Sequence, residues 1–305
     1  MKKNNFMNTY ADNVRDEIFE TKPLKGKYKD AFSYGILLMG NEFNSDAVTI
    51  ATEHSAVSKL YGFAISDIVN VRADFWGHQT KNGKSLYNCR LSDPPARQAL
   101  LKHFNHPSHG INEEIIGGDA FPQFLAGVFM AAGSVSDPEK TYHLEFVPPS
   151  GELCDILFEH LTEIGYPPKS SQRRGSTVIY YKESSQIEDI LTIMGAQKSS
   201  LLLMEAKIYK DLRNRANRST NCETANIDKT VKAAISQRED IAFLLEKNIL
   251  ETLTPALKSA AMLRLDNPDS SLSELASLSG VSRSGVNHRL MKLCEIARKI
   301  KGEEN

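Results

Sequence analysis

Residues 124–133 read Phe-Leu-Ala-Gly-Val-Phe-Met-Ala-Ala-Gly. None of these side chains is polar, so a helix formed here has no face for solvent and is expected to be buried all round. Alanine and glycine at positions 126, 127, 131 and 132 leave room for a second helix to lie close against it. The segment therefore predicts a central packing helix, which we place at Phe121–Ala132.

From Leu125 onward, the same segment can be laid over the LAGLIDADG signature of homing endonucleases. The signature is matched at Leu125, Ala126, Gly127, Ala131 and Gly133. Its last acidic residue, which holds the divalent metal in the nucleases, falls on Ala132. Because alanine has no oxygen to offer a metal ion, the segment indicates a DNA-handling fold and argues against DNA cleavage.

The composition is that of an ordinary soluble globular chain. The sequence has 305 residues, 41% of them hydrophobic and 25% charged, and a formal net charge of -1. It is long enough for two domains, and any basic surface for nucleic acid must be local. The longest apolar stretches are too short to cross a bilayer, and the first residues lack the apolar core of a signal peptide. These features predict a cytoplasmic protein without membrane contact.

Residues that could hold a metal do not form a convincing set. The cysteines are widely scattered, at Cys89, Cys154, Cys222 and Cys294. They form no Cys-x-x-Cys pair, so we expect reduced thiols and no iron–sulfur or zinc site. His103, His106 and His109 are evenly spaced, but Pro107 breaks a helix between them, and an ordinary loop is favoured. We therefore expect no metal and no cofactor.

Residues 1–220 repeat one order of elements. The first half, about 1–115, has predicted helices over 6–20, Ala31–Met39, Ser55–Leu60 and Ala96–Phe104, and predicted strands over Ala47–Thr52, Asn70–Gly77 and Ser85–Leu91. The second half, about 116–220, has predicted helices over Phe121–Ala132, Gly151–Ile164 and Ser185–Met194, and predicted strands over His143–Val147 and Val178–Lys182. Both follow the order helix, strand, helix, strand, helix, which we interpret as a diverged internal duplication.

The rest of the chain is expected to be helical. Residues 201–247 are polar and contain no proline, which predicts one long helix, or two with a break near Asn221–Asn226. We assign 221–247 as a helical linker and 248–305 as a separate domain.

Residues 272–293 have the spacing of a helix-turn-helix. Gly280 can take the left-handed conformation that a sharp turn between helices demands, and Ser282 is placed to cap the second helix. Val286 and Leu290 then face the core. A plain helical hairpin with a solvated polar face is the alternative, but it is disfavoured because these signals coincide.

This orientation points polar and basic side chains outward. The candidate DNA-binding residues are Ser282, Arg283, Ser284, Asn287, His288, Arg289, Lys292, Arg298 and Lys299. Arginine and lysine reach phosphate or guanine, and asparagine can read adenine with two hydrogen bonds. Possible phosphate contacts also come from a second basic stretch, at Lys207, Lys210, Arg213, Arg215 and Arg218. For that stretch, an ordinary solvated helix face is an equal alternative.

With these residues in view, the chain resembles the WhiA family of bacterial sporulation and cell-division regulators. Three segments carry the resemblance: Phe124–Val147, Asn217–Val231 and Leu272–Leu293. The resemblance implies an α+β fold, with a duplicated LAGLIDADG homing endonuclease-like domain over 1–220. It also implies an all-α, sigma-factor-like helix-turn-helix domain at 248–305.

In the nucleases two signature helices pack side by side, and each supplies one acid to the metal sites. The first such helix would be Phe32–Gly40 here, with its last acidic position on Met39. With Met39 and Ala132 both apolar, two-metal cleavage lacks its ligands, and we expect no catalytic residues. Asp137 and Glu139 follow the second helix, but a relocated acid pair is disfavoured because metal geometry tolerates little displacement.

The resemblance implies a non-catalytic, sequence-specific DNA-binding transcription regulator involved in sporulation or in cell division and chromosome segregation. Its expected partners are double-stranded promoter DNA and another transcription factor or RNA polymerase, and its expected place is the nucleoid. Two alternatives stay open: a diverged metal-dependent endonuclease, and a protein-interaction scaffold at the nucleoid.

Overall fold

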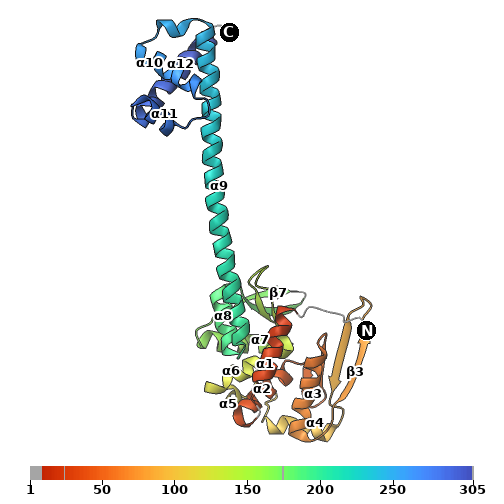
Figure 1. The fold of residues 1–305 in the computed structure, drawn as a ribbon. Coiled ribbons are helices and arrows are strands. Elements are labelled where there is room, and N and C mark those ends of the chain that lie inside the picture. Colours follow the sequence, from red (N-terminus) through yellow and green to blue (C-terminus); the bar gives the residue numbers. More distant parts are fainter. Residues whose placement is uncertain (1–8, 24, 174, 304–305) are drawn as a thin grey trace, which may run out of the picture. The chain divides into compact units, whose positions relative to one another are not determined.

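The computed structural model describes residues 9–23, 25–173 and 175–303. Contacts between residues divide the chain into two compact units, Met1–Asp211 and Leu212–Asn305 (Figure 1). The predicted boundary lies at residue 220, a few residues later. Each unit has its own hydrophobic core, so each is described by itself.

The first unit contains the same set of elements twice. The first set is α2 (Gly26–Leu38), β1 (Glu42–Phe43), β2 (Val48–Thr52), α3 (Ser55–Val69), β3 (Asp74–Gln79), β4 (Ser85–Arg90) and α4 (Pro94–His103). The second set is α6 (Phe121–Ala132), β5 (Gly133–Val135), β6 (Leu144–Phe146), α7 (Gly151–Glu163), β7 (Lys169–Arg173), β8 (Ser176–Tyr181) and α8 (Ser184–Ile193). Helix α1 (Tyr10–Thr21) precedes the first set, and α5 (Glu113–Ile116) and a 3-10 turn (Gly118–Ala120) precede the second.

Each set forms one antiparallel four-stranded sheet. The strand orders are β1-β2-β4-β3 and β5-β6-β8-β7, which are the same order in both sets. Helices cover one face of each sheet. In the first sheet, for example, the Phe75 ring of β3 packs on Gly62 of α3, and a Cβ built on Gly62 would lie only 2.1 Å from Phe75 Cζ. The predicted internal duplication and the α+β class are thereby confirmed.

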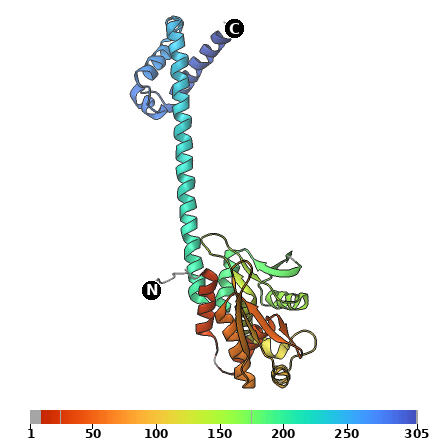
Figure 2. The same ribbon diagram turned by 90° about the vertical axis from the view of Figure 1, so that its right-hand side faces the viewer.

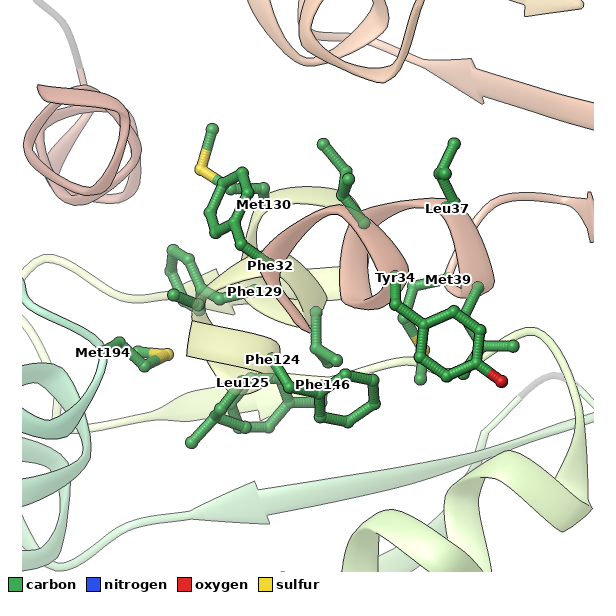
Figure 3. Packing of buried hydrophobic residues seen from close by; sticks show 14 of the residues in the cluster. Phe32, Tyr34, Leu37, Met39, Phe124, Leu125, Phe129, Met130, Phe146 and Met194 are labelled. Carbon is green, nitrogen blue, oxygen red and sulfur yellow. The ribbon is translucent and has the colours of Figure 1, made fainter. Parts of the chain in front are cut away.

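Helices α2 and α6 pack against each other at the centre of this unit (Figure 3). The approach is closest at two glycines. A Cβ built on Gly35 would lie 2.3 Å from the carbonyl oxygen of Phe124, and one built on Gly127 would lie 2.2 Å from that of Phe32. Only glycine allows backbones to come this close. The two helices are therefore related by a reciprocal contact, as two copies of one motif would be.

Helix α9 runs without interruption from Gln197 to Glu246. Its start is fixed by α1, because the Glu17 carboxylate accepts hydrogen bonds from the backbone N–H groups of Lys198 (2.6 Å) and Ser199 (2.9 Å). A carboxylate at this place satisfies helix N–H groups that have no partner within the helix. Of the two predicted alternatives, the single long helix is the one observed, without a break near Asn221–Asn226. No proline or glycine occurs within α9, so nothing in the backbone forces a break.

The second unit packs three helices against the last turns of α9 (Figure 2). After a 3-10 turn (Ile249–Thr252) come α10 (Pro255–Asp266), α11 (Leu272–Ser279) and α12 (Arg283–Glu303). Their core contains Ile241, Leu244, Ala261, Leu275 and Leu290. This unit is all-α, the class predicted for the C-terminal domain, and its core includes Ile241 and Leu244, which were assigned from the sequence to a linker over 221–247.

Several predicted bounds need correction. Pro94 and Pro95 do not precede α4 but form its first turn, where proline needs no hydrogen-bond donor. Helix α3 continues to Val69 and is capped by Asn70 at φ 54°, so β3 starts at Asp74 rather than at Asn70. Strand β7 was not predicted, because its residues are all polar and show no alternation of apolar side chains. Phe6, counted in the first predicted helix, lies outside the described residues.

Candidate nucleic-acid interface

The turn between α11 and α12 has the geometry of a helix-turn-helix. Ser271 caps α11, and Glu274 returns a hydrogen bond of 2.6 Å by accepting from the Ser271 backbone N–H. The backbone and side-chain hydrogen bonds from Ser271 hold the pKa of Glu274 below its usual range. Gly280 then turns the chain at φ 66°. Ser282 Oγ accepts a 3.2 Å hydrogen bond from the Gly285 N–H and so caps α12.

One face of α12 is fixed by burial. Val286, Leu290 and Leu293 are buried and pack with Leu275 of α11. The opposite face therefore points to solvent. The exposed candidate residues are Ser282, Arg283, Ser284, His288, Lys292, Arg298 and Lys299, and the partly buried ones are Asn287 and Arg289. This distribution matches the predicted orientation of the second helix.

The basic side chains on this face differ in their contacts. Lys292 and Lys299 both approach Glu295, at 2.9 and 3.1 Å, and these hydrogen bonds lower the pKa of Glu295. Exposed pairs of this kind are weak and can exchange for phosphate at little cost. Within the described residues, Arg283 and Arg298 have no carboxylate within 4 Å. These two guanidinium groups are free to meet a ligand.

The second basic stretch, on α9, divides into two parts. Lys207 pairs with Glu188 at 3.3 Å, and the Lys210 ammonium lies 4.5 Å from the ring centroid of Tyr142. Both lysines thus contact the second sheet–helix set. Arg213, Arg215 and Arg218 are exposed and form no ion pair in the described part of the chain. The structure therefore separates two lysines that are already engaged from three arginines that are not.

The acid positions of the nuclease signature are apolar in both helices. Ala132 is the last residue of α6, and Met39 is the buried C-cap of α2. Gly35 and Gly127 make equivalent contacts, each with the carbonyl oxygen three residues before the other, and this gives a register one residue away from the predicted one. By this packing, the counterpart of Ala132 is Gly40 rather than Met39. Neither residue offers a side-chain oxygen, so the change of register leaves this end of the helix pair without metal ligands from the signature.

A residue that the sequence interpretation missed lies at the same end of α6. Arg15 of α1 is 9% exposed, and its Nη2 donates a 2.6 Å hydrogen bond to the carbonyl oxygen of Gly133. Burial lowers the pKa of this guanidinium, and nearby Asp12 opposes that shift. A signal was present: Arg15 follows Ala11 by four residues and precedes Ile18 by three, so it stands in line with apolar positions of the helix.

The other residues considered as ligands are dispersed. His103 ends α4 and approaches Asp30, whereas His106 Nδ1 lies 2.7 Å from the Tyr34 hydroxyl. Asp137 lies in a turn, where its carboxylate accepts from the Glu139 N–H. Over the residues that the structure describes, no three His, Cys, Asp or Glu side chains are grouped as a metal ion would require.

Comparisons with known proteins agree with this architecture. A family model described as WhiA LAGLIDADG-like domain matches residues 121–213, and one described as WhiA C-terminal HTH domain matches residues 216–297. The "Probable cell division protein WhiA" of Thermoanaerobacter pseudethanolicus is 35% identical over 314 residues, which cover 96% of this chain and 98% of that relative. This chain belongs to the WhiA family.

A second WhiA relative, from Lachnoclostridium phytofermentans, is 37% identical over 264 residues, which cover 82% of this chain and 84% of the relative. The full-length DUF199/WhiA crystal structure from Thermatoga maritima superposes with a TM-score of 0.56 at 19% identity, over 96% of this chain and 99% of that one. The fold is therefore that of WhiA: a LAGLIDADG-like domain followed by a helix-turn-helix domain. Among the described helices, none is long and apolar enough to cross a lipid bilayer.

Proposed function

We propose that this WhiA-family protein is a non-catalytic, sequence-specific DNA-binding regulator of transcription, acting at the nucleoid in sporulation or in cell division and chromosome segregation. The observation that carries the proposal is the helix-turn-helix of α11 and α12. Its second helix buries Val286, Leu290 and Leu293 and presents Arg283, Asn287 and His288 on the other side. Helix-turn-helix proteins place such a face in the major groove of DNA.

Within this face, we assign base reading to the first turns of α12. Arg283 and Asn287 are the residue types that make two hydrogen bonds each to guanine and adenine, respectively. Further polar and basic groups nearby along the chain come from Ser282, Ser284, His288, Arg289 and Lys292. Arg298 and Lys299 lie farther along α12, where they suit phosphate.

The test is duplex binding by the full-length protein. Promoter-derived duplexes should be bound with an affinity that falls steeply with salt, because phosphate contacts release counterions. Replacing both Arg283 and Asn287 by alanine should abolish the preference for one promoter sequence over a scrambled duplex. Unchanged preference in that double variant contradicts the assignment of α12 as the reading helix.

For the LAGLIDADG-like domain we propose a role without catalysis, in contacting DNA or a protein partner. Its apolar signature ends argue against metal-dependent cleavage. The alternative, a diverged endonuclease, predicts nicking of supercoiled plasmid in the presence of Mg²⁺. Absence of nicking under conditions where the plasmid is bound supports the non-catalytic proposal, and clean metal-dependent nicking contradicts it.

A protein partner is favoured by one surface of this domain. The first turns of α9 expose Leu201, Leu202 and Ile208 to solvent. Contiguous exposed apolar side chains of this kind often mark a protein interface. We propose that the partner is another transcription factor or RNA polymerase. Replacing Leu201 and Ile208 by serine should then abolish the protein's effect on transcription from a bound promoter, in whichever direction it acts, while duplex binding is kept.

A further inference from the structure

One segment of α9 differs from the rest of the helix in its surroundings and its charge. Every residue from 211 to 233 is exposed, so this part of α9 is solvated around its whole circumference. Helices of this kind gain nothing from tertiary packing, and isolated helices are only marginally stable in water. A ligand that contacts the segment directly would account for its composition.

The charge of the segment is one-sided. From Leu212 to Cys222 there are three arginines and no acidic residue, and the first carboxylate after them is Glu223. The arginines are Arg213, Arg215 and Arg218. None has an ion-pair partner in the part of the chain that the structure describes. An anionic surface is the occupant that this charge fits.

The same segment carries a row of asparagines. Asn214, Asn217 and Asn221 stand at spacings of three and four residues, so they share one face of the helix with Arg218. Their side-chain amides make no hydrogen bond within the described residues. Asparagine reads adenine through two hydrogen bonds in the major groove, and arginine reads guanine or meets phosphate. The segment thus carries side chains that can bind bases and side chains that can bind phosphate.

The dimensions fit a DNA groove. Eleven helical residues span about 16 Å at the usual rise. The major groove is about 12 Å wide and admits a bare α-helix. Residues 211–233 are all exposed, so the surface of this segment is available to a ligand. Basic regions that are continuous helices enter the major groove in this way.

We propose that residues 213–221 of α9 form a second DNA-reading element, whose Asn214, Asn217, Asn221 and Arg218 face the bases of a major groove. Arg213 and Arg215 contact the flanking phosphates. This inference rests on the proposed DNA-binding function and adds to it a bipartite site, one part read by α12 and the other by α9. The ligand is double-stranded DNA; a protein partner for the segment is a competing outcome of the test.

The first test compares charge variants in the full-length protein. The probe is a duplex selected from a random pool by the wild-type protein. The triple variant Arg213→Gln, Arg215→Gln, Arg218→Gln should reduce the slope of log affinity against log salt by about 1.8, at roughly 0.9 for each of the two phosphate contacts of Arg213 and Arg215. A matched control removes the same charge from the same helix, by Lys229→Gln, Lys232→Gln and Arg238→Gln, and should leave the slope unchanged.

The second test addresses base reading. The triple variant Asn214→Ala, Asn217→Ala, Asn221→Ala keeps the charge and is compatible with a helix. It should weaken binding to the selected duplex by about fivefold or more, and should not weaken binding to a duplex in which only the α9 portion of the site is scrambled. Equal affinity of this variant and the wild type for the selected duplex would overturn the assignment of the asparagines.

Cys222 permits a direct test of proximity. It is exposed, whereas Cys89, Cys154 and Cys294 are buried, so a tethered iron chelate can be attached to it alone. The chelate should cleave the DNA outside the base pairs for which the Arg283→Ala, Asn287→Ala variant loses its sequence preference. Cys222→Ser supplies the background.

The outcomes separate the two proposals. If the α12 variant loses sequence preference while the α9 variants and the chelate are silent, the second element is wrong and the proposed function stands. If the α12 variant keeps the full preference of the wild type, including that for the part of the site assigned to α12, the proposed function fails whatever α9 does. Loss of a protein partner by the arginine variant, with DNA binding unchanged, would overturn the DNA assignment of α9.

Discussion

The guanidinium of Arg15 donates a 2.6 Å hydrogen bond to the carbonyl oxygen of Gly133, the residue that follows Ala132 at the end of α6. A buried cation thus lies where the carbonyl groups of a helix end leave partial negative charge. In the nucleases that this fold resembles, the same helix end supplies an acid to a metal ion. Here the positive charge beside this helix end comes from the chain itself, from the Arg15 guanidinium of α1.

Replacing Arg15 by methionine should destabilise the first unit. The Gly133 carbonyl would lose its donor while remaining buried, and a lost partner of this kind costs about 1–3 kcal/mol. Nε and Nη1 of Arg15 make no hydrogen bond, so their removal offsets part of this cost. We expect a net loss of about 1–2 kcal/mol in urea unfolding. As a control, Lys84→Met breaks an exposed pair with Glu53 and should cost less than about 0.5 kcal/mol.

Replacing Gly127 or Gly35 by alanine should be more damaging. Each added Cβ would lie within 2.3 Å of a backbone oxygen in the facing helix, which cannot move without separating α2 from α6. We expect a loss of about 3 kcal/mol or more, at the upper end of overpacking costs, in urea unfolding. Gly151→Ala is the matched control: it also lies in a helix, but no atom comes within 4 Å of its added Cβ. That variant should be neutral or slightly stabilised, and equal effects at Gly127 and Gly151 would refute the close approach.

His106 should make the first unit less stable in acid. Burial lowers the pKa of His106 and raises the pKa of Tyr34 to about 12, so the folded state favours a neutral imidazole beside a protonated hydroxyl. The Tyr34 hydroxyl accepts from the Asn112 N–H and keeps its own proton, which it can donate to His106 Nδ1 while that nitrogen is unprotonated; a protonated Nδ1 cannot accept it.

The direction of the pH effect follows from this pairing. A lowered pKa means that the unfolded chain takes up the proton first. The contribution to stability is complete above the ordinary value of 6.5 and is lost as the pH falls through the lowered pKa. His106→Asn keeps a polar atom near Nδ1 and cannot titrate. Its free energy of unfolding should therefore fall less than that of the wild type between pH 7.5 and pH 5; parallel curves would contradict the assignment.

Gly280→Ala should loosen the turn of the helix-turn-helix. An added Cβ would have open space, but the backbone at φ 66° is strained for any residue with a Cβ, at a cost of about 1–2 kcal/mol. Gly302→Ala also meets no atom within 4 Å but lies within α12, so it isolates the backbone effect. Faster hydrogen exchange in α11 and α12 is expected for Gly280→Ala alone. Similar exchange in both variants would show that the left-handed conformation is not needed.

Local patterns in the sequence account well for the helix-turn-helix. A capping serine, a glycine in the left-handed region and apolar residues at spacings of three and four lie within 22 residues, and each acts through neighbours along the chain. The same holds for the apolar character of Phe121–Ala132, which predicted a central packing helix without an acid. The repeated order of elements predicted the duplication because each element follows from its own periodicity.

Other features were decided only by the tertiary structure, because they depend on contacts between residues far apart in the sequence. The register between the two signature helices follows from the equivalent contacts of Gly35 with Phe124 and of Gly127 with Phe32, which make Gly40 the counterpart of Ala132. The role of Arg15 depends on a carbonyl 118 positions away, and the basic stretch of α9 divides because Glu188 and Tyr142 happen to lie beside its lysines. Periodicity and capping reflect interactions between residues that are close together in the sequence. Which segments meet, and at what register, is set by the packing of side chains that no local pattern records.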